Sequence, residues 1–222
     1  MYLSAIPKLL RQYYSRYVWK IDTDEKKLYL TFDDGPTPDI TEWVLSQLEK
    51  YEAKASFFLI GDKVRKYPEI VHQLIDAGHS LGNHTQNHIK GRKTDNKRYL
   101  KNFLLAQKTI SEYSGYRTDL FRPPYGSINN LQAEKILQTH RIIMMDVISG
   151  DFDRKRSPEI CAKKVIKHAK AGSIVLFHDS EKAWPRLQTA LPIVLEHFSQ
   201  EGYQFEEIPA HPPLMKIERE MM

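Results

Sequence analysis

The sequence predicts an α/β fold, a distorted (β/α) barrel of about seven parallel strands with outer helices. Short runs that are apolar throughout alternate with helical patterns along the chain, which is typical of strands covered on both faces. The chain has 222 residues, enough for one domain but short for a closed eight-stranded barrel. Hydrophobic residues make up 41% and charged residues 27%, which allows a sizeable core.

The expected strands are seven short runs with few charged residues. They are residues 28–32, 55–59, 79–82, 119–121, 141–145, 173–177 and 203–206. Because most of these runs do not alternate between apolar and polar residues, they suit a parallel sheet that is buried on both faces.

Five helices are expected between these strands, and each has a recognisable start or stop. In chain order the signals are Thr37-Pro38-Asp39, Pro68 with Gly78, Gly115, Ser157 with Gly172, and Gly202. In the first, the Thr37 hydroxyl would cap the helix, with proline at its first position and an acid in the first turn. Glycines suit the stops, because they tolerate the left-handed conformation that often ends a helix.

Residues 1–24 are expected to form a basic, aromatic, helical extension before a main domain of residues 25–222. We interpret the extension as a helix that packs its aromatic side chains onto the domain. A peripheral contact with a membrane surface is the alternative. The chain has no run of about 18 apolar residues and no secretory apolar region at its start, so we expect a cytoplasmic protein without a spanning helix.

The net charge of +5 and a pI of about 9.1 favour anionic partners mildly. No zinc-finger pattern, RNA-binding motif or long basic arm is present, so nucleic acid is not an expected partner. The single cysteine, Cys161, excludes an internal disulfide and is expected to be a small buried residue on a helix.

Unusual polar residues follow five of the expected strands. They are Asp33 and Asp34 after the first, His84 and His88 after the third, Arg122 after the fourth, Asp146 and Asp151 after the fifth, and His178 and Asp179 after the sixth. In parallel βα folds the carboxyl ends of the strands share one rim, where active sites are built. We therefore expect these five segments to converge.

His84 and His88 are four residues apart, so on a helical turn both imidazoles face one way. With Asp34 on the same rim, they suit a divalent transition metal with open positions. A non-haem iron oxygenase uses the same kind of ligand set and remains an alternative. Taken alone, the histidines could be ordinary packing residues, and Asp34-Gly35-Pro36 could be a simple turn.

Three further segments allow either a functional or a structural reading. His178 ends a very apolar strand, so it either faces the rim or is a core histidine with a capped ring. Asp151 is its natural partner, although Ser149-Gly150-Asp151 could also be a turn. Arg122 and the two prolines after it form either a rigid connection or a stiff wall that presents backbone N–H groups of Tyr125-Gly126 to the site.

Taken in order, the motifs resemble those of the NodB-type polysaccharide deacetylases, carbohydrate esterase family 4. They are Thr31-Phe32-Asp33-Asp34-Gly35, His84-Thr85-x-x-His88, Arg122-Pro123-Pro124-Tyr125, Asp151-Phe152 and Leu176-Phe177-His178. The resemblance implies a metal-dependent hydrolase that removes acetyl groups from N-acetylated amino-sugar glycans, such as peptidoglycan, chitin-like polymers or a GlcNAc-containing precursor. An esterase of O-acetylated xylan-type glycans and a non-catalytic glycan-binding homologue are the alternatives.

The resemblance also implies a role for each motif residue. Asp34, His84 and His88 would hold the metal, most often zinc, with cobalt, nickel or manganese as further candidates. Asp33 would be the general base paired with Arg122, and His178 the general acid held by Asp151. Substrate contacts would come from Tyr125, Leu176, Phe152 and Pro124. Phe152 departs from the family pattern, which usually has tryptophan there, and this puts substrate detail in question.

Overall fold

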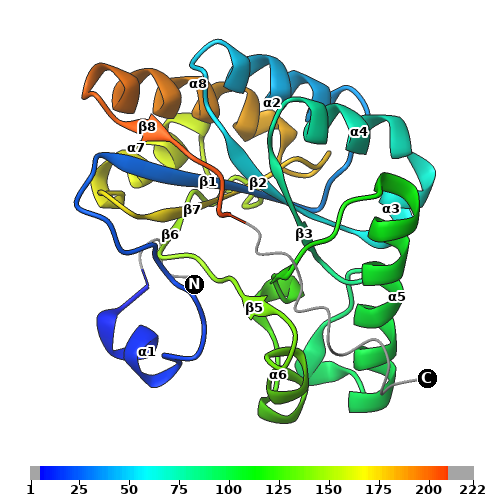
Figure 1. Ribbon diagram of the computed structural model, residues 1–222. Coiled ribbons are helices and arrows are strands. Elements are labelled where there is room, and N and C mark those ends of the chain that lie inside the picture. Colours follow the sequence, from blue (N-terminus) through cyan, green and yellow to red (C-terminus); the bar gives the residue numbers. More distant parts are fainter. Residues whose placement is uncertain (1–5, 210–222) are drawn as a thin grey trace.

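The computed structural model describes residues 6–209 (Figure 1). Its strands are β1 (Lys27–Asp33), β2 (Ala55–Leu59), β3 (Ser80–Asn83), β4 (Leu120–Phe121), β5 (Arg141–Ile142), β6 (Val147–Ile148), β7 (Ile174–His178) and β8 (Gln204–Phe205). They form one sheet in the order β5-β4-β3-β2-β1-β7-β6, with β8 beside the start of β1. All ladders are parallel, and the sheet curls into a half-barrel. The predicted fold class is confirmed.

The fifth expected strand, residues 141–145, is wrong in its extent. The chain leaves the edge of the sheet after Ile142, so the expected run supplies only β5. The chain reaches the opposite edge at Val147, where it forms β6, a strand that was not predicted. Between them the backbone bonds elsewhere: the N–H of Met144 donates to Val18 at 2.7 Å, and that of Asp146 to Ile174 at 3.2 Å.

Eight α-helices surround the sheet in the described residues. They are α1 (Lys8–Tyr13), α2 (Ile40–Glu49), α3 (Gly61–Lys66), α4 (Pro68–Asp76), α5 (Asn96–Ser114), α6 (Asn130–Ile136), α7 (Pro158–His168) and α8 (Trp184–Gln200), with single 3₁₀ turns at Gly91–Lys93 and Pro124–Gly126. The five expected helices correspond to α2, α4, α5, α7 and α8. The short helices α3 and α6 were not predicted.

Two predicted helix signals act differently in the structure. Asp39 rather than Thr37 precedes α2, because Asp39 has a φ of 64° and helical backbone begins only after it. The Asp39 N–H donates to the Glu42 carboxylate at 2.9 Å. Gly172 does not close α7, which ends at His168; it turns the chain into β7, and its N–H donates to Lys27 at 2.8 Å.

Alternation along β1 separates the core from the site. Leu30 and Phe32 face outward into the main core, which the sheet forms with α2, α4, α7 and α8. The Phe32 ring stacks on those of Phe57 and Phe177 at 5.0 and 6.0 Å. Thr31 and Asp33 therefore face the inside of the curl, where a polar side chain can serve a ligand.

The segment from Ile6 to Ile21 packs against the connection between β5 and β6. The N–H of Val18 donates to Ile142 at 2.9 Å, and that of Ile6 to Asp146 at 3.0 Å. Tyr17 and Trp19 are buried there, which confirms for these two residues that the aromatics pack on the domain. Tyr13 at the end of α1 is exposed, and Tyr2 lies outside the described residues. None of the helices within residues 6–209 is long and apolar enough to cross a membrane. Cys161 is buried on α7, as predicted.

Candidate active site

Asp33, the last residue of β1, is held by a buried arginine. The Arg122 Nη1 donates to Asp33 Oδ1 at 2.7 Å and to Thr31 Oγ1 at 2.8 Å. Its Nε and Nη2 donate to the carbonyls of Ile143 and Met144 at 3.2 and 3.0 Å. Arg122 is fully buried. Because each guanidinium nitrogen is engaged, the arginine fixes the orientation of the Asp33 carboxylate, and the predicted pairing of the two residues is confirmed.

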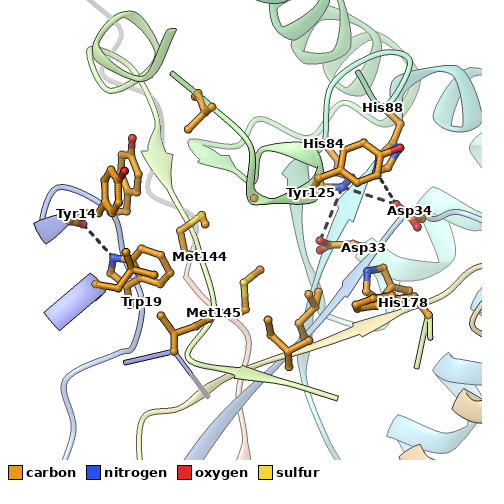
Figure 2. A pocket seen from close by; sticks show the side chains of 18 of the residues that line it. Tyr14, Trp19, Asp33, Asp34, His84, His88, Tyr125, Met144, Met145 and His178 are labelled. Carbon is orange, nitrogen blue, oxygen red and sulfur yellow. Dashed lines mark hydrogen bonds and ion pairs between the residues drawn. The ribbon is translucent and has the colours of Figure 1, made fainter. Parts of the chain in front are cut away.

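Asp34, His84 and His88 lie together beside this pair (Figure 2). Asp34 Oδ1 is 3.1 Å from His88 Nε2 and 3.7 Å from His84 Nε2. The predicted helical turn is wrong, since the two histidines lie in a loop after β3. Thr85 and His88 have positive φ angles of 65° and 54°, and the Thr85 N–H donates to the Asn83 side chain at 2.8 Å. The loop nevertheless turns both imidazoles toward Asp34.

The donor chemistry of this cluster fits a divalent cation. His84 Nδ1 is 2.7 Å from the carbonyl oxygen of Arg122, which can only accept, so the proton resides on Nδ1 and the Nε2 lone pair faces the site. That lone pair faces Asp34 Oδ1 and, at 3.8 Å, Asp33 Oδ2. Burial lowers the pKa of His84 to about 4, so the ring stays neutral. When such lone pairs converge at a buried site, they can coordinate a metal ion.

The charge of Asp34 also favours a cation. Burial would raise the pKa of this carboxyl, but its hydrogen bond to His88 and the nearby His178 and His84 outweigh burial and hold it well below its usual range. Asp34 therefore presents an anionic oxygen across the working pH range.

His178, the last residue of β7, is held by Asp151. Its Nδ1 is 2.8 Å from Asp151 Oδ1, and its backbone N–H donates to Asp151 Oδ2 at 2.7 Å. Burial favours the neutral ring, but the Asp151 carboxylate outweighs it and raises the pKa of His178 to about 9. Asp151 is itself fully buried, and Arg186 binds its backbone carbonyl at 2.6 Å. The ring of Phe152 packs edge-on against His178 at 5.2 Å.

Two acids expected at the rim lie elsewhere. Asp146 accepts bonds from the Ser173 hydroxyl and the Ile174 N–H, both at 2.9 Å, so it sits at the start of β7, at the opposite end of that strand from His178. Asp179 is fully buried and accepts a bond from the Thr41 hydroxyl at 2.6 Å. It fills the space behind Gly35, where an added Cβ would lie 2.1 Å from its carboxylate. Both acids have structural partners.

A pocket of about 660 Å³ opens over these groups. Its lining includes Asp33, Asp34, His84, His88 and His178, together with the predicted substrate residues Leu176, Phe152 and Tyr125. The exposed Tyr125 ring lies 4.6 Å from that of His88. Pro124, the fourth predicted contact, is buried and does not line the pocket. Gly126, two residues further along the chain, does line it.

Known proteins resemble this chain in sequence and in structure. Residues 20–140 match the family model described as polysaccharide deacetylase. The chain belongs to this family. A peptidoglycan-N-acetylglucosamine deacetylase of Bacillus cereus is 34% identical over 189 residues, which are 84% of this chain and 88% of that protein. The peptidoglycan-N-acetylmuramic acid deacetylase PdaC of Bacillus subtilis is 32% identical over 83% of this chain, and the match spans only 38% of its length.

One solved structure resembles this chain over nearly the whole length of both proteins. The Bc1960 peptidoglycan N-acetylglucosamine deacetylase has a TM-score of 0.84 and 27% identity, over 92% of this chain and 95% of that one. The resemblance drawn from the motifs is thereby confirmed, and the chain is assigned to a family of hydrolases.

Sequence reasoning missed the far half of the pocket of this deacetylase. That half is lined by Ile6, Leu10, Tyr14, Tyr17, Trp19, Arg92, Ile128 and Met144, and the rest of the lining includes Gly126, Met145, Ile148 and Lys182. The aromatic residues before position 20 are visible in the sequence, but nothing in their spacing indicates that they reach the pocket. Long-range contacts bring them there, among them the pairing of Val18 with Ile143 and the bond from the Ile6 N–H to Asp146.

Proposed function

We propose that this chain is a metal-dependent hydrolase that removes acetyl groups from N-acetylated amino sugars of a glycan, with peptidoglycan or a related polymer or precursor as substrate. The observation that carries the proposal is the convergence of three elements: the cluster of Asp34, His84 and His88, the arginine-bound Asp33, and the Asp151-bound His178. The names of the relatives, which are peptidoglycan deacetylases, support the substrate class.

Asp34, His84 and His88 would hold the metal. Two neutral imidazoles and one carboxylate suit zinc with an open position, and they also accept cobalt, nickel or manganese. When bound, such an ion lowers the pKa of a coordinated water to about 7 and polarises a carbonyl oxygen.

Asp33 is placed to act as the general base. Arg122 occupies its Oδ1, so Oδ2 remains to accept a proton, and Oδ2 is the oxygen that faces His84 Nε2 at 3.8 Å. As the oxygen of the attacking water bonds to the acetyl carbon, its proton passes to Asp33. The arginine holds the acceptor in one orientation throughout, which reduces the reorganisation the reaction requires.

His178 is placed to act as the general acid. With its pKa at about 9, the imidazole is protonated at neutral pH. An amine leaves poorly as an anion, so His178 gives its proton to the amide nitrogen as the carbon–nitrogen bond breaks, and acetate and a free amine result. General acid–base help of this kind typically contributes about 10²–10⁴ in rate.

The pH dependence of kcat/KM should reflect the pKa of His178, which Asp151 raises. The acid form of His178 is present below its raised pKa and lost as pH rises through it, so kcat/KM should fall on the alkaline side. Asp151→Asn removes the charge that raises this pKa, so the alkaline limb should move to lower pH. Asp153→Asn, two residues along in the chain, is the matched control and should not move the limb. An identical limb in Asp151→Asn and wild type would contradict the assignment.

The experiment that tests the proposed function follows acetate and free amine from N-acetylated chito-oligosaccharides. Chelated protein should be inactive, and zinc or cobalt should restore it anaerobically without oxoglutarate, which excludes an oxygenase. Peptidoglycan fragments, nucleotide- or lipid-linked GlcNAc and acetyl-xylan complete the panel. Acetate from acetyl-xylan alone would identify an esterase, and glycan binding without acetate would identify a non-catalytic homologue.

A further inference from the structure

An apolar channel continues from the catalytic groups to the N-terminal segment (Figure 2). In the figure, Met145 and Met144 lie between His178 and Trp19, and all four residues line one pocket. Leu176 and Met145 belong to one apolar cluster, and Met144 and Trp19 to another, so the channel joins two clusters. The whole pocket, which includes the groups around Asp33 and His178, has a volume of about 660 Å³, in the range of sites that hold drug-sized ligands.

The far wall of the channel is held in place by backbone hydrogen bonds to a distant segment of the chain. Tyr17 and Trp19 belong to it, and both are more than nine-tenths buried. Val18 anchors them by strand-like bonds to Ile142 and Met144. They precede residues 20–140, which match the family model.

The Trp19 and Arg92 side chains of this wall already make hydrogen bonds. The Trp19 indole N–H donates to the carbonyl of Tyr14 at 3.0 Å. Burial raises the pKa of the Tyr17 hydroxyl, which therefore stays neutral. Arg92, which lines the outer part, donates to the carbonyl of Ile128 at 3.1 Å and lies 3.4 Å from the Tyr14 hydroxyl. Each hydroxyl of a sugar ring would need a hydrogen-bond partner in this mostly apolar lining, whereas an alkyl chain needs none.

We propose that the channel holds the alkyl part of an N-acyl group longer than acetyl, so that the enzyme also hydrolyses N-butyryl to N-octanoyl amino sugars. The inference rests on the proposed function and names a further substrate class for the same site. Leu176 lies two residues before His178 on β7, so both side chains face the pocket, and Leu176 would contact the first carbon beyond the carbonyl. From there the alkyl chain would run past Ile148 and Met145, with Phe152 also in the lining.

The reaction is the same amide hydrolysis. The oxygen of water bonds to the acyl carbon, the carbon–nitrogen bond breaks, and the amine nitrogen takes a proton from His178. The products are a fatty acid carboxylate and a free amine, and no oxidant or second substrate is consumed.

The first test measures kcat/KM of the zinc-loaded protein on chitosan trimers carrying N-acetyl, N-butyryl, N-hexanoyl or N-octanoyl groups. One buried methylene contributes about fourfold, so N-hexanoyl should exceed N-acetyl by at least tenfold. If acetate is released but N-hexanoyl groups are hydrolysed more than tenfold more slowly than N-acetyl groups, the inference is overturned and the proposed function stands. Absence of acetate release would instead refute the proposed function.

The second test blocks the channel in an already folded protein. Met144→Cys supplies a thiol that can be capped with propyl methanethiosulfonate, while Cys161 is fully buried and burial raises its pKa to about 11. Capping should lower the ratio of N-hexanoyl to N-acetyl rates at least tenfold, and reduction should restore it. Ser46→Cys, on the exposed face of α2, is the control and should show no change in the ratio.

Three results of this second test would overturn the inference. One is an unchanged ratio after capping, and another is failure of the reagent to modify Met144→Cys by mass spectrometry, which would show a closed channel. The third concerns a different substrate: capping slows deacetylation of the octyl glycoside of N-acetylglucosamine relative to the methyl glycoside, but leaves N-hexanoyl hydrolysis unchanged. In that case the alkyl chain would enter from the glycosidic side of the substrate.

Discussion

Asp33→Asn should abolish turnover while the protein keeps its metal, and Asp34→Asn should lose the metal. The two neighbouring acids have different surroundings. Asp33 is bound to Arg122 through one oxygen, whereas Asp34 Oδ1 faces both His84 and His88. An amide in place of Asp33 still accepts from the arginine but no longer takes a proton from water. We expect kcat to fall about 10²–10⁴-fold, the usual range for a lost general base.

Metal content after dialysis, measured beside acetate release, separates the two variants. Asp34→Asn should lose more than the 10–100-fold in metal affinity that changes around a ligand shell usually cause, because it removes a ligand. Asp39→Asn, on the exposed side of the same loop, should match wild type in both measurements. Equal metal loss in Asp33→Asn and Asp34→Asn would show that the acids do not divide their roles in this way.

His178→Ala should keep full metal content and lose about 10²–10⁴-fold in rate. Its Nδ1 is occupied by Asp151 at 2.8 Å, and the ring lies outside the cluster of Asp34, His84 and His88. Added imidazole should restore part of the rate, because it supplies the missing proton donor. His72→Ala, an exposed histidine on α4, should change neither quantity. A fall in metal content parallel to the loss of rate would place His178 among the ligands.

The residues at strand ends were predictable because strand polarity is a local property. The strands β1 and β7 are largely apolar runs whose last residues, Asp33 and His178, are polar, and their parallel pairing aligns these ends. Asp146 and Asp151 show where this reasoning fails. The two-residue strand β6 lies between them, so Asp146 is at the start of neighbouring β7 and Asp151 beside its end. A strand of two residues is specified by its pairing with β7, and its own residues do not predict it.

The loop that carries His84 and His88 and the aromatic wall of the pocket are also set by distant contacts. The N–H groups of Gly61 and Asp62 donate to the carbonyls of Thr85 and Gln86 at 3.1 and 3.0 Å. The positive φ angles of Thr85 and His88 place the second histidine, and spacing by four residues suggested a helix instead. The aromatic wall depends on Val18 reaching Ile143. In each case the chemical groups were visible in the sequence, while the backbone geometry that gathers them comes from segments far along the chain.

The bonds between Val18 and the stretch just after β5 have a consequence for biosynthesis. When the ribosome has made the segment that ends at Trp19, the surface on which Trp19 packs does not yet exist, since Ile142 and Met144 come much later. At about 5–20 residues per second, the nascent aromatic segment waits several seconds in water before it can dock. During that interval its aromatic side chains are exposed to water, and its docking after position 144 has emerged completes the second side of the cavity.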